Sequence, residues 1–203
     1  QKARLLPGLA DGSVQAAIAL AGEVAHSGGK FSGDAGTALG AGLADLLLVA
    51  TGDDVGVIDL RGAGVTVKTP ANLDPTRRCA KVKLADAAGE LLAGARTALV
   101  DSARLVLAAE AVGVARECTN AAAEYAKERQ QFGRPIAMYQ AVKHHCANML
   151  VATELATSTV WDAARAAAKG GPEATYTAAA AAALAVPAAY LCANLNTQVH
   201  GGI

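Results

Sequence analysis

The residues best suited to chemistry lie together in the stretch Arg129-Gln130-Gln131-Phe132-Gly133. The guanidinium of Arg129 offers a planar fork of donors that suits phosphate or carboxylate, and Gln131 adds an amide donor and acceptor. The ring of Phe132 can stack on a planar ring, and Gly133 lets the backbone approach a ligand closely. These residue types predict a site for a nucleotide-like group that carries both phosphate and base. The alternative is a helix C-terminus with a surface charge, a hydrophobic plug and a glycine stop.

A long helix must position this cluster. Between Arg96 and Glu128, small and apolar residues recur at steps of three or four, which predicts a helix about 50 Å long. A helix of that length suits a bundle. The stripe expected to be buried consists of Val100, Ala103, Leu107, Ala111, Val114, Cys118, Ala122 and Tyr125.

Glycine and proline mark the other helix ends. Gly133 and Pro135 end the first helix, and a second is predicted from about Tyr139 to Lys169, where Gly170-Gly171-Pro172 stops it. A third continues to about Val199, with a kink expected near Pro187. Three antiparallel helices joined by short loops predict an up-down bundle that lacks at least one member, and we expect the chain to be part of a longer protein.

The first half of the chain has a different pattern. Apolar runs at 45–50 and 55–60 flank a Gly-Asp turn, which predicts a β-hairpin. Further candidate strands lie at 14–20, 65–67 and 79–84. Because no helical crossover separates these runs, an antiparallel sheet or barrel is favoured. The predicted fold class is therefore α+β, with a β-domain over residues 1–95 and an incomplete α-helical bundle over 96–203.

The charge of the chain excludes two kinds of partner. Eighteen basic and eighteen acidic residues cancel, so no basic field attracts nucleic acid or an anionic membrane. The alanine-rich segment 178–189 is too weakly apolar and too short to span a membrane, and Pro187 interrupts it. We therefore predict a cytoplasmic protein without nucleic-acid or membrane partners.

No metal site is predicted. His144 and His145 are interpreted as a solvated or capped pair, since no acidic or cysteine ligand is well placed beside them. The cysteines match no zinc or CxxC spacing and are expected to be buried, reduced thiols. They are Cys79, Cys118, Cys146 and Cys192.

Five stretches of the chain have a characteristic order of residues. The chain reads YAKERQQFGRPIAMYQ from Tyr125 to Gln140 and QVHGG from Gln198 to Gly202. Earlier it reads DSAR at 101–104, LDPTRRCAKV at 73–82 and LLPGL at 5–9. These stretches resemble, in order, segments of the middle β-domain and the C-terminal helical bundle of acyl-CoA dehydrogenases. The resemblance is strong from residue 96 onward and patchy before it.

The resemblance implies an activity and a cofactor. The family oxidises acyl-CoA thioesters to trans-2-enoyl-CoA with FAD as hydride acceptor and a glutamate as base. By resemblance, Arg129 would meet the FAD pyrophosphate, Gln131 would add a hydrogen bond, and Phe132 would pack near the adenine end. In the family this cluster reaches an FAD held mostly by a neighbouring subunit.

By the same resemblance, the second motif, Gln198 to Gly202, would bind the ADP portion of FAD. Gln198, Gly201 and Gly202 would line it, with the glycines exposing backbone N–H groups to an anion. His200 is interpreted as an ordinary polar residue. Arg104 would lie near the CoA substrate, or would form a surface ion pair with Asp101.

Two departures from the family pattern bear on catalysis. No catalytic residue is identified: one branch of the family places its glutamate beyond the position of Ile203, and another places it where this chain has Ala103. Glu110, two turns further, falls on a different face. The flavin-clasping stretch is also degraded, since Ala21 lacks a hydroxyl, and Ser27 is a substitute of unknown position.

Three hypotheses follow. The first is a supporting subunit of a heteromeric acyl-CoA dehydrogenase that acts on steroid side-chain CoA esters. By resemblance the enzyme would be a tetramer, with a homologous subunit and an electron-transfer acceptor as partners. The second is an ordinary homotetrameric dehydrogenase with its glutamate outside this sequence. The third is a helical assembly protein without flavin.

Overall fold

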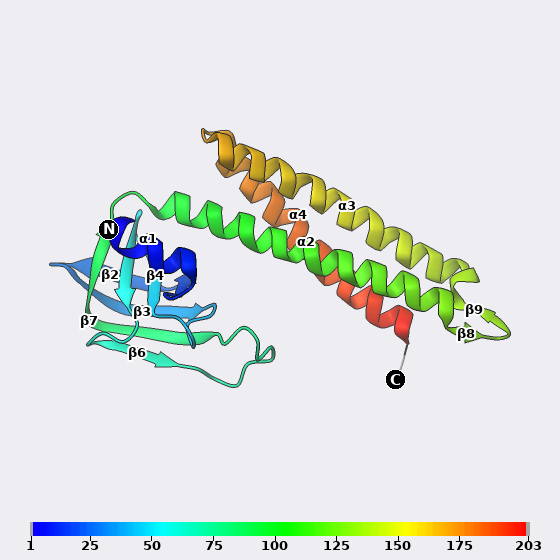
Figure 1. The fold of residues 1–203 in the computed structure, drawn as a ribbon, viewed down its shortest axis with the longest axis horizontal. Helices are drawn as coiled ribbons and strands as arrows, with labels where there is room; N and C mark the ends of the chain where they lie inside the picture. Colours follow the sequence, from blue (N-terminus) through cyan, green and yellow to red (C-terminus); the bar gives the residue numbers. More distant parts are fainter. Residues whose placement is uncertain (1, 202–203) are drawn as a thin grey trace. The chain divides into compact units, whose positions relative to one another are not determined.

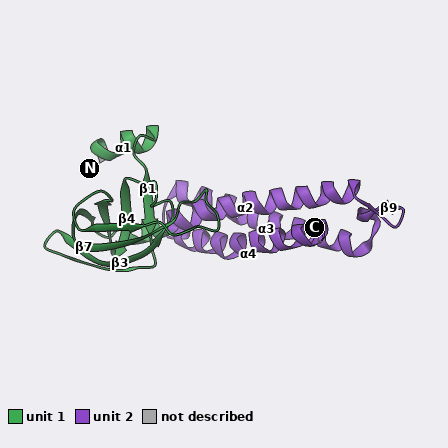
Figure 2. Cartoon of the chain, turned by 90° about the horizontal axis from the view of Figure 1, so that it is seen from below, with its two compact units in different colours: residues 1–100 green, residues 101–203 purple. Residues whose placement is uncertain are grey.

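A computed structural model describes residues 2–201 of the chain. The chain forms two compact units, residues 1–100 and residues 101–203, which are coloured separately in Figure 2. Each unit has its own core, and each is described here by itself.

The first unit is a curled β-sheet preceded by a short helix, α1 (Lys2–Asp11). Seven strands form one sheet in the order β1-β4-β5-β7-β3-β2, with β6 pairing with β7 (Figure 1). The pairing is antiparallel except between β1 and β4, which run parallel. The strands are β1 (Ala16–Ala19), β2 (Glu23–Ser27), β3 (Lys30–Ala38), β4 (Leu46–Thr51), β5 (Asp54–Asp59), β6 (Val65–Lys68) and β7 (Ala80–Leu92).

The predicted hairpin is confirmed: β4 and β5 pair with Leu47 opposite Ile58 and Thr51 opposite Asp54. The hairpin of β2 and β3 was not predicted, because its many glycines resemble loop breakers. The structure shows why glycine stands at two of these positions, Gly22 just before β2 and Gly33 inside β3. A Cβ on Gly22 would lie 2.4 Å from the carbonyl oxygen of Asp34, and a Cβ on Gly33 would lie 2.1 Å from that of Glu23. Glycine is needed where the two backbones approach this closely.

Large aliphatic side chains and one phenylalanine fill the core of the β-unit. Phe31 is fully buried, and its ring fits against two glycines: a Cβ on Gly56 would lie 2.5 Å from the ring, and one on Gly89 would lie 2.9 Å from it. Leu47 and Ile58 are also fully buried in the same cluster. The two glycines therefore shape the cavity that holds the ring.

The second unit is a helical bundle whose helices run up, down and up (Figure 1). Its helices are α2 (Arg96–Glu128), α3 (Gln140–Lys169) and α4 (Glu173–His200). The predicted ends of α2 are confirmed, and those of α3 agree within one residue. Gly170, with φ of 72°, caps α3 by donating its N–H to Ala166 O. The predicted α+β architecture, β-domain followed by up-down bundle, is confirmed.

The bundle core is made mostly of alanine, and α3 and α4 approach each other closely. Its apolar residues fall into two clusters. Between them lies a buried polar layer with one residue from each helix: Thr119, Thr153 and Cys192. The two hydroxyl oxygens are 3.1 Å apart, and Cys192 Sγ lies 3.7 Å from Thr119 Oγ1 and 3.6 Å from Thr153 Oγ1.

The predicted buried stripe of α2 is only partly correct. Ala103 and Ala122 are buried, but Leu107 and Val114 are exposed. The helix turns mainly small residues inward. The buried residues of α2 are Ala103, Ala108, Val112, Ala115, Thr119, Ala122 and Ala126.

Helix α4 is more apolar than predicted. Over its 28 residues it is long and apolar enough, by composition alone, to cross a membrane, and it continues as a helix through Pro187. The sequence-based argument from segment 178–189 was therefore too narrow. Ala181, Ala185 and Cys192 of this helix are fully buried in the two apolar clusters of the bundle.

Candidate functional site

The stretch after α2 is a tight β-hairpin and not a simple helix stop. Strand β8 (Gln130–Gln131) pairs with β9 (Arg134–Pro135) through a turn at Phe132 and Gly133. Their φ angles of 53° and 76° place both turn residues in the left-handed region, as a type I′ turn requires. Phe132 is 92% exposed at the tip, which contradicts the alternative that it plugs the helix end.

Tyr139 holds this hairpin in place. Its hydroxyl donates to Gln131 O at 3.1 Å, and the guanidinium of Arg134 lies 4.3 Å from the centre of its ring. The Phe132 ring meets it edge-on with centroids 6.5 Å apart. The Ile136 N–H also donates to Arg129 O at 2.8 Å. Sequence analysis included Tyr139 in the motif but gave it no role.

Two of the polar side chains predicted to bind a ligand are available beside the turn. Within residues 2–201, neither the guanidinium of Arg129 nor the amide of Gln131 forms a hydrogen bond or ion pair, and both residues are exposed. Backbone contacts fix the hairpin, so these side chains are presented by an ordered support. Such an arrangement suits a ligand with phosphate groups.

The second motif lies at the C-terminal end of α4. Gln198 is exposed there, and Gly201 follows with φ of 79°. The N–H of Gly201 donates to Thr197 O at 3.1 Å and to Gln198 O at 3.2 Å. The expectation that this N–H is exposed to an anion was wrong, because it caps the helix. Gly202 lies outside the described residues.

Tyr125 and His200 bring the two motifs to the same end of the bundle. Their rings stack with centroids 4.1 Å apart and 22° between the planes, and Tyr125 Oη donates to His200 O at 3.4 Å. His200 Nδ1 lies 2.9 Å from Asn196 O. Arg129 follows Tyr125 by one helical turn, and Figure 1 shows the hairpin and the end of α4 at this end. His200 is therefore a packing residue and not an ordinary surface polar group.

A groove between α3 and α4 adjoins the second motif. No carboxylate is among the residues that line it, so the groove suits a polar or anionic group. The two histidines of the predicted pair differ in exposure: His144 is exposed, whereas His145 is half-buried in the groove. The lining residues are His145, Asn194, Leu195, Thr197, Gln198 and Gly201.

These donors fit the ADP end of FAD. The guanidinium of Arg129 matches a phosphate, the amides of Gln131 and Gln198 match phosphate or ribose oxygens, and the exposed ring of Phe132 can pack on a base. The fit rests on side chains, since the Gly201 amide is already used. These residues could therefore hold that part of the cofactor.

At the start of the bundle, Arg104 is already paired. Its Nη1 lies 3.3 Å from Asp101 Oδ1, and Asp101 Oδ2 accepts a hydrogen bond of 2.6 Å from Thr175. The ion-pair alternative is thus present, and a substrate role for Arg104 stays a prediction. Ala103, one residue before it, is buried and has no proton-accepting group. Glu110 is exposed further along α2.

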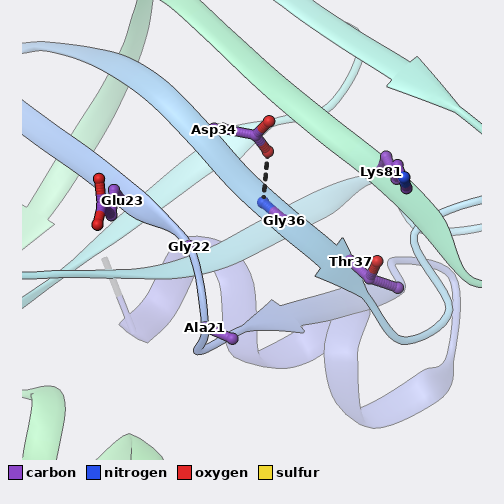
Figure 3. A pocket seen from close by; sticks show the side chains of 7 residues that line it. All are labelled: Ala21, Gly22, Glu23, Asp34, Gly36, Thr37 and Lys81. Atoms are coloured by element: carbon purple, nitrogen blue, oxygen red, sulfur yellow. Dashed lines mark hydrogen bonds between the residues drawn. The ribbon is translucent and has the colours of Figure 1, made fainter.

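The β-unit has a separate open pocket, shown in Figure 3. Ala21 lines it, whereas Ser27 ends β2 and does not. Thr37 supplies a hydroxyl to this pocket that sequence analysis did not single out. The N–H of Gly36 donates to Asp34 Oδ1 at 2.8 Å and lowers the pKa of that carboxyl. The lining residues are Ala21, Gly22, Glu23, Asp34, Gly36, Thr37 and Lys81.

Neither a metal centre nor a reactive thiol is evident in the part of the chain that the structure describes. No group of three or more His, Cys, Asp or Glu residues there could hold a metal ion. The four cysteines are free thiols; Cys192 is buried and the others are half-buried. Burial raises the pKa of the Cys118 and Cys146 thiols.

Comparisons with known proteins define the family. The model of the "Acyl-CoA dehydrogenase, C-terminal domain" matches residues 93–203. The chain is 37% identical over 98% of its length to acyl-CoA dehydrogenase FadE34 of Mycobacterium tuberculosis, and 36% identical over 83% to acyl-CoA dehydrogenase IpdE2 of the same organism. It covers only 29% and 52% of those two relatives.

Solved structures agree with this match. A variant of the Tcur3481-Tcur3483 steroid ACAD superposes with a TM-score of 0.88 and 26% identity, over 99% of this chain and 60% of that one. Butyryl-CoA dehydrogenase from Megasphaera elsdenii gives a TM-score of 0.82 at 21% identity, over 99% of this chain and 61% of that one, which shows the shared fold. The chain belongs to the acyl-CoA dehydrogenase family.

Proposed function

We propose that this chain is the supporting subunit of a heteromeric, FAD-dependent acyl-CoA dehydrogenase that converts acyl-CoA to trans-2-enoyl-CoA. In this role it binds the ADP end of an FAD whose flavin is held mostly by a homologous subunit. A tetramer, a cytoplasmic location and an electron-transfer acceptor complete the proposal. When bound, FAD supplies the hydride acceptor for the reaction.

One observation carries this proposal: the side chains of Arg129, Gln131 and Gln198, which have no partner among residues 2–201, lie at one end of the bundle. They come from motifs about seventy residues apart in sequence, which the stacked pair Tyr125 and His200 brings together. Arg129 would bind phosphate, and the two amides would bind phosphate or ribose oxygens. Phe132, and Gly201 and Gly202 beyond Gln198, would line the same portion.

The supporting role is inferred from two positions whose side chains cannot take part in the reaction. Ala103 is buried where one branch of the family is expected to carry its base, and a methyl group cannot accept a proton. Ala21 has no hydroxyl at the position where the resemblance implies one for clasping the flavin, although Thr37 lines the same pocket. The chain thus retains side chains for one end of the cofactor, and the two positions expected to serve the reacting end carry alanine. A homologous subunit that supplies both functional groups would complete the enzyme.

The similarity to the Tcur3481-Tcur3483 steroid ACAD supports the substrate class. That protein is named as a steroid enzyme, and its name pairs two designations, as a heteromeric enzyme would require. We therefore propose a bulky steroid side-chain CoA ester as the substrate. Arg104 would contact the CoA portion only after release from Asp101.

The test is flavin retention by the complex with its homologous partner. Arg129→Ala should weaken FAD binding at least about tenfold, because a charge-assisted hydrogen bond is worth about 1.5–3 kcal/mol. Arg116→Ala is the matched control: this arginine lies on α2, the helix that ends one residue before Arg129, and its side chain contacts Thr157 Oγ1 at 3.3 Å. Flavin absorbance per complex after gel filtration measures the effect.

The outcomes separate the hypotheses. A yellow complex formed from a colourless isolated chain supports the proposal. A yellow homo-oligomer of this polypeptide alone favours the ordinary homotetrameric enzyme. Equal flavin content in the Arg129 and Arg116 variants would mean that the hairpin is structural.

A further inference from the structure

His145 differs from its neighbour in a way that the sequence does not show. Both histidines lie near the start of α3, but His144 is exposed and His145 is half-buried, lining the groove beside Gln198 and Gly201. The groove therefore receives a side chain from α3, a helix that carries, of the two motifs, only Gln140, the last residue of the first motif. His145 is therefore the candidate for a further ligand contact in this groove.

The hydrogen bonds around the groove show which groups remain available. Thr197 donates its only hydroxyl proton to Ala193 O at 3.0 Å, and Asn194 Nδ2 donates to Tyr190 O at 2.9 Å. In residues 2–201, by contrast, the side chains of His145 and Gln198 form no hydrogen bond. A neutral imidazole carries one N–H donor, and a protonated one carries two.

We propose that His145 is a further contact residue for the dinucleotide, donating a hydrogen bond to a phosphate or ribose oxygen of its adenylate half. This inference rests on the proposed function, and it deepens it by adding a third element, α3, to the hairpin and the end of α4. A groove lined by donors and acceptors without a carboxylate is suited to such an oxygen-rich group.

The experiment compares His145→Ala with His144→Ala in the assembled complex. A fluorescence titration with FAD measures the dissociation constant, and competition by ADP isolates the adenylate half. His145→Ala should weaken FAD and ADP binding by about 2- to 12-fold, as for loss of one hydrogen bond worth about 0.5–1.5 kcal/mol. His144→Ala should stay within about twofold of the parent, as expected for an exposed side chain without a partner.

A conservative variant separates binding from folding. His145→Gln keeps a side-chain donor and should recover part of the lost affinity for ADP. The inference is overturned if His145→Ala binds ADP as well as His144→Ala, or if His145→Gln binds no better than His145→Ala. If Arg129→Ala still loses FAD in that case, the proposed function stands without His145. If Arg129→Ala also retains FAD, the proposed function itself fails.

Discussion

The two phenylalanines of the chain lie in two regions that are packed differently. Phe31 is fully buried in the β-unit, between strands whose glycines at 56 and 89 make room for its ring. Phe132 is 92% exposed on a two-residue turn at the end of the bundle. The β-core is stabilised by large apolar side chains, whereas the bundle core has alanines and a polar layer. The Phe31 ring therefore stabilises the β-unit, whereas the Phe132 ring is exposed and available for contacts.

The largest expected effect follows from this contrast. Phe31→Ala should destabilise the β-unit by about 3–5 kcal/mol, because it removes a large buried side chain and leaves a cavity between rigid strands. Phe132→Ala, the matched control, should change stability by less than about 0.5 kcal/mol. Hydrogen exchange during denaturant unfolding measures the effects, in β3 and β7 for Phe31→Ala and in α2 and α3 for Phe132→Ala. Equal effects of the two substitutions would contradict the contrast.

A smaller effect is expected in the polar layer of the bundle. Thr119 donates to Ala115 O at 2.8 Å, so Thr153 is the donor in the contact between the two hydroxyls. Thr153→Val removes this buried bond and should cost about 1 kcal/mol. In Thr177→Val the lost hydroxyl bonds only its own helix, to Glu173 O, and the change should be within about 0.5 kcal/mol.

Fluorescence of Trp161, the only tryptophan of the chain, reports unfolding of the bundle for both threonine variants. A stabilising effect of Thr153→Val would show that the polar layer weakens the core. The layer would then serve to fix which helix positions meet, as some buried polar groups do.

The smallest effect concerns Cys118. Burial is the main cause that raises the pKa of this thiol, and nearby Cys192 and Glu117 act in the same direction. A raised pKa means less thiolate at neutral pH, so the pH midpoint of alkylation by iodoacetamide should lie above that of the same residue in unfolded protein. Because the folded pKa is raised, the associated stability is present below the unfolded pKa and is lost as pH rises through the folded value.

Peptide mapping by mass spectrometry assigns the modified cysteine. The midpoint is the decisive quantity, because restricted access would slow alkylation at every pH without moving it. An unshifted midpoint in the folded protein would show that water reaches this part of the bundle, and that its interior is less apolar than the packing indicates.

Much of the fold could be predicted because its signals are local. Arg96–Glu128 has an unbroken helical pattern between clear stops, and the runs around residues 51–54 are typical of a hairpin. The strands β2 and β3 could not be predicted, since Gly22 and Gly33 are required by a close approach between backbones. Such an approach exists only once the strands are paired.

The candidate site, too, could be predicted only in part from the sequence. The sequence by itself determined the residue types and spacing of the two motifs, and hence the family and the expected ligand. Only the tertiary structure decided that Phe132 points outward, that the Gly201 amide caps a helix, and that His145 and not His144 lines the groove. Local chemistry fixes turns and helix ends, but which side chains remain unpartnered depends on contacts between segments far apart in the chain.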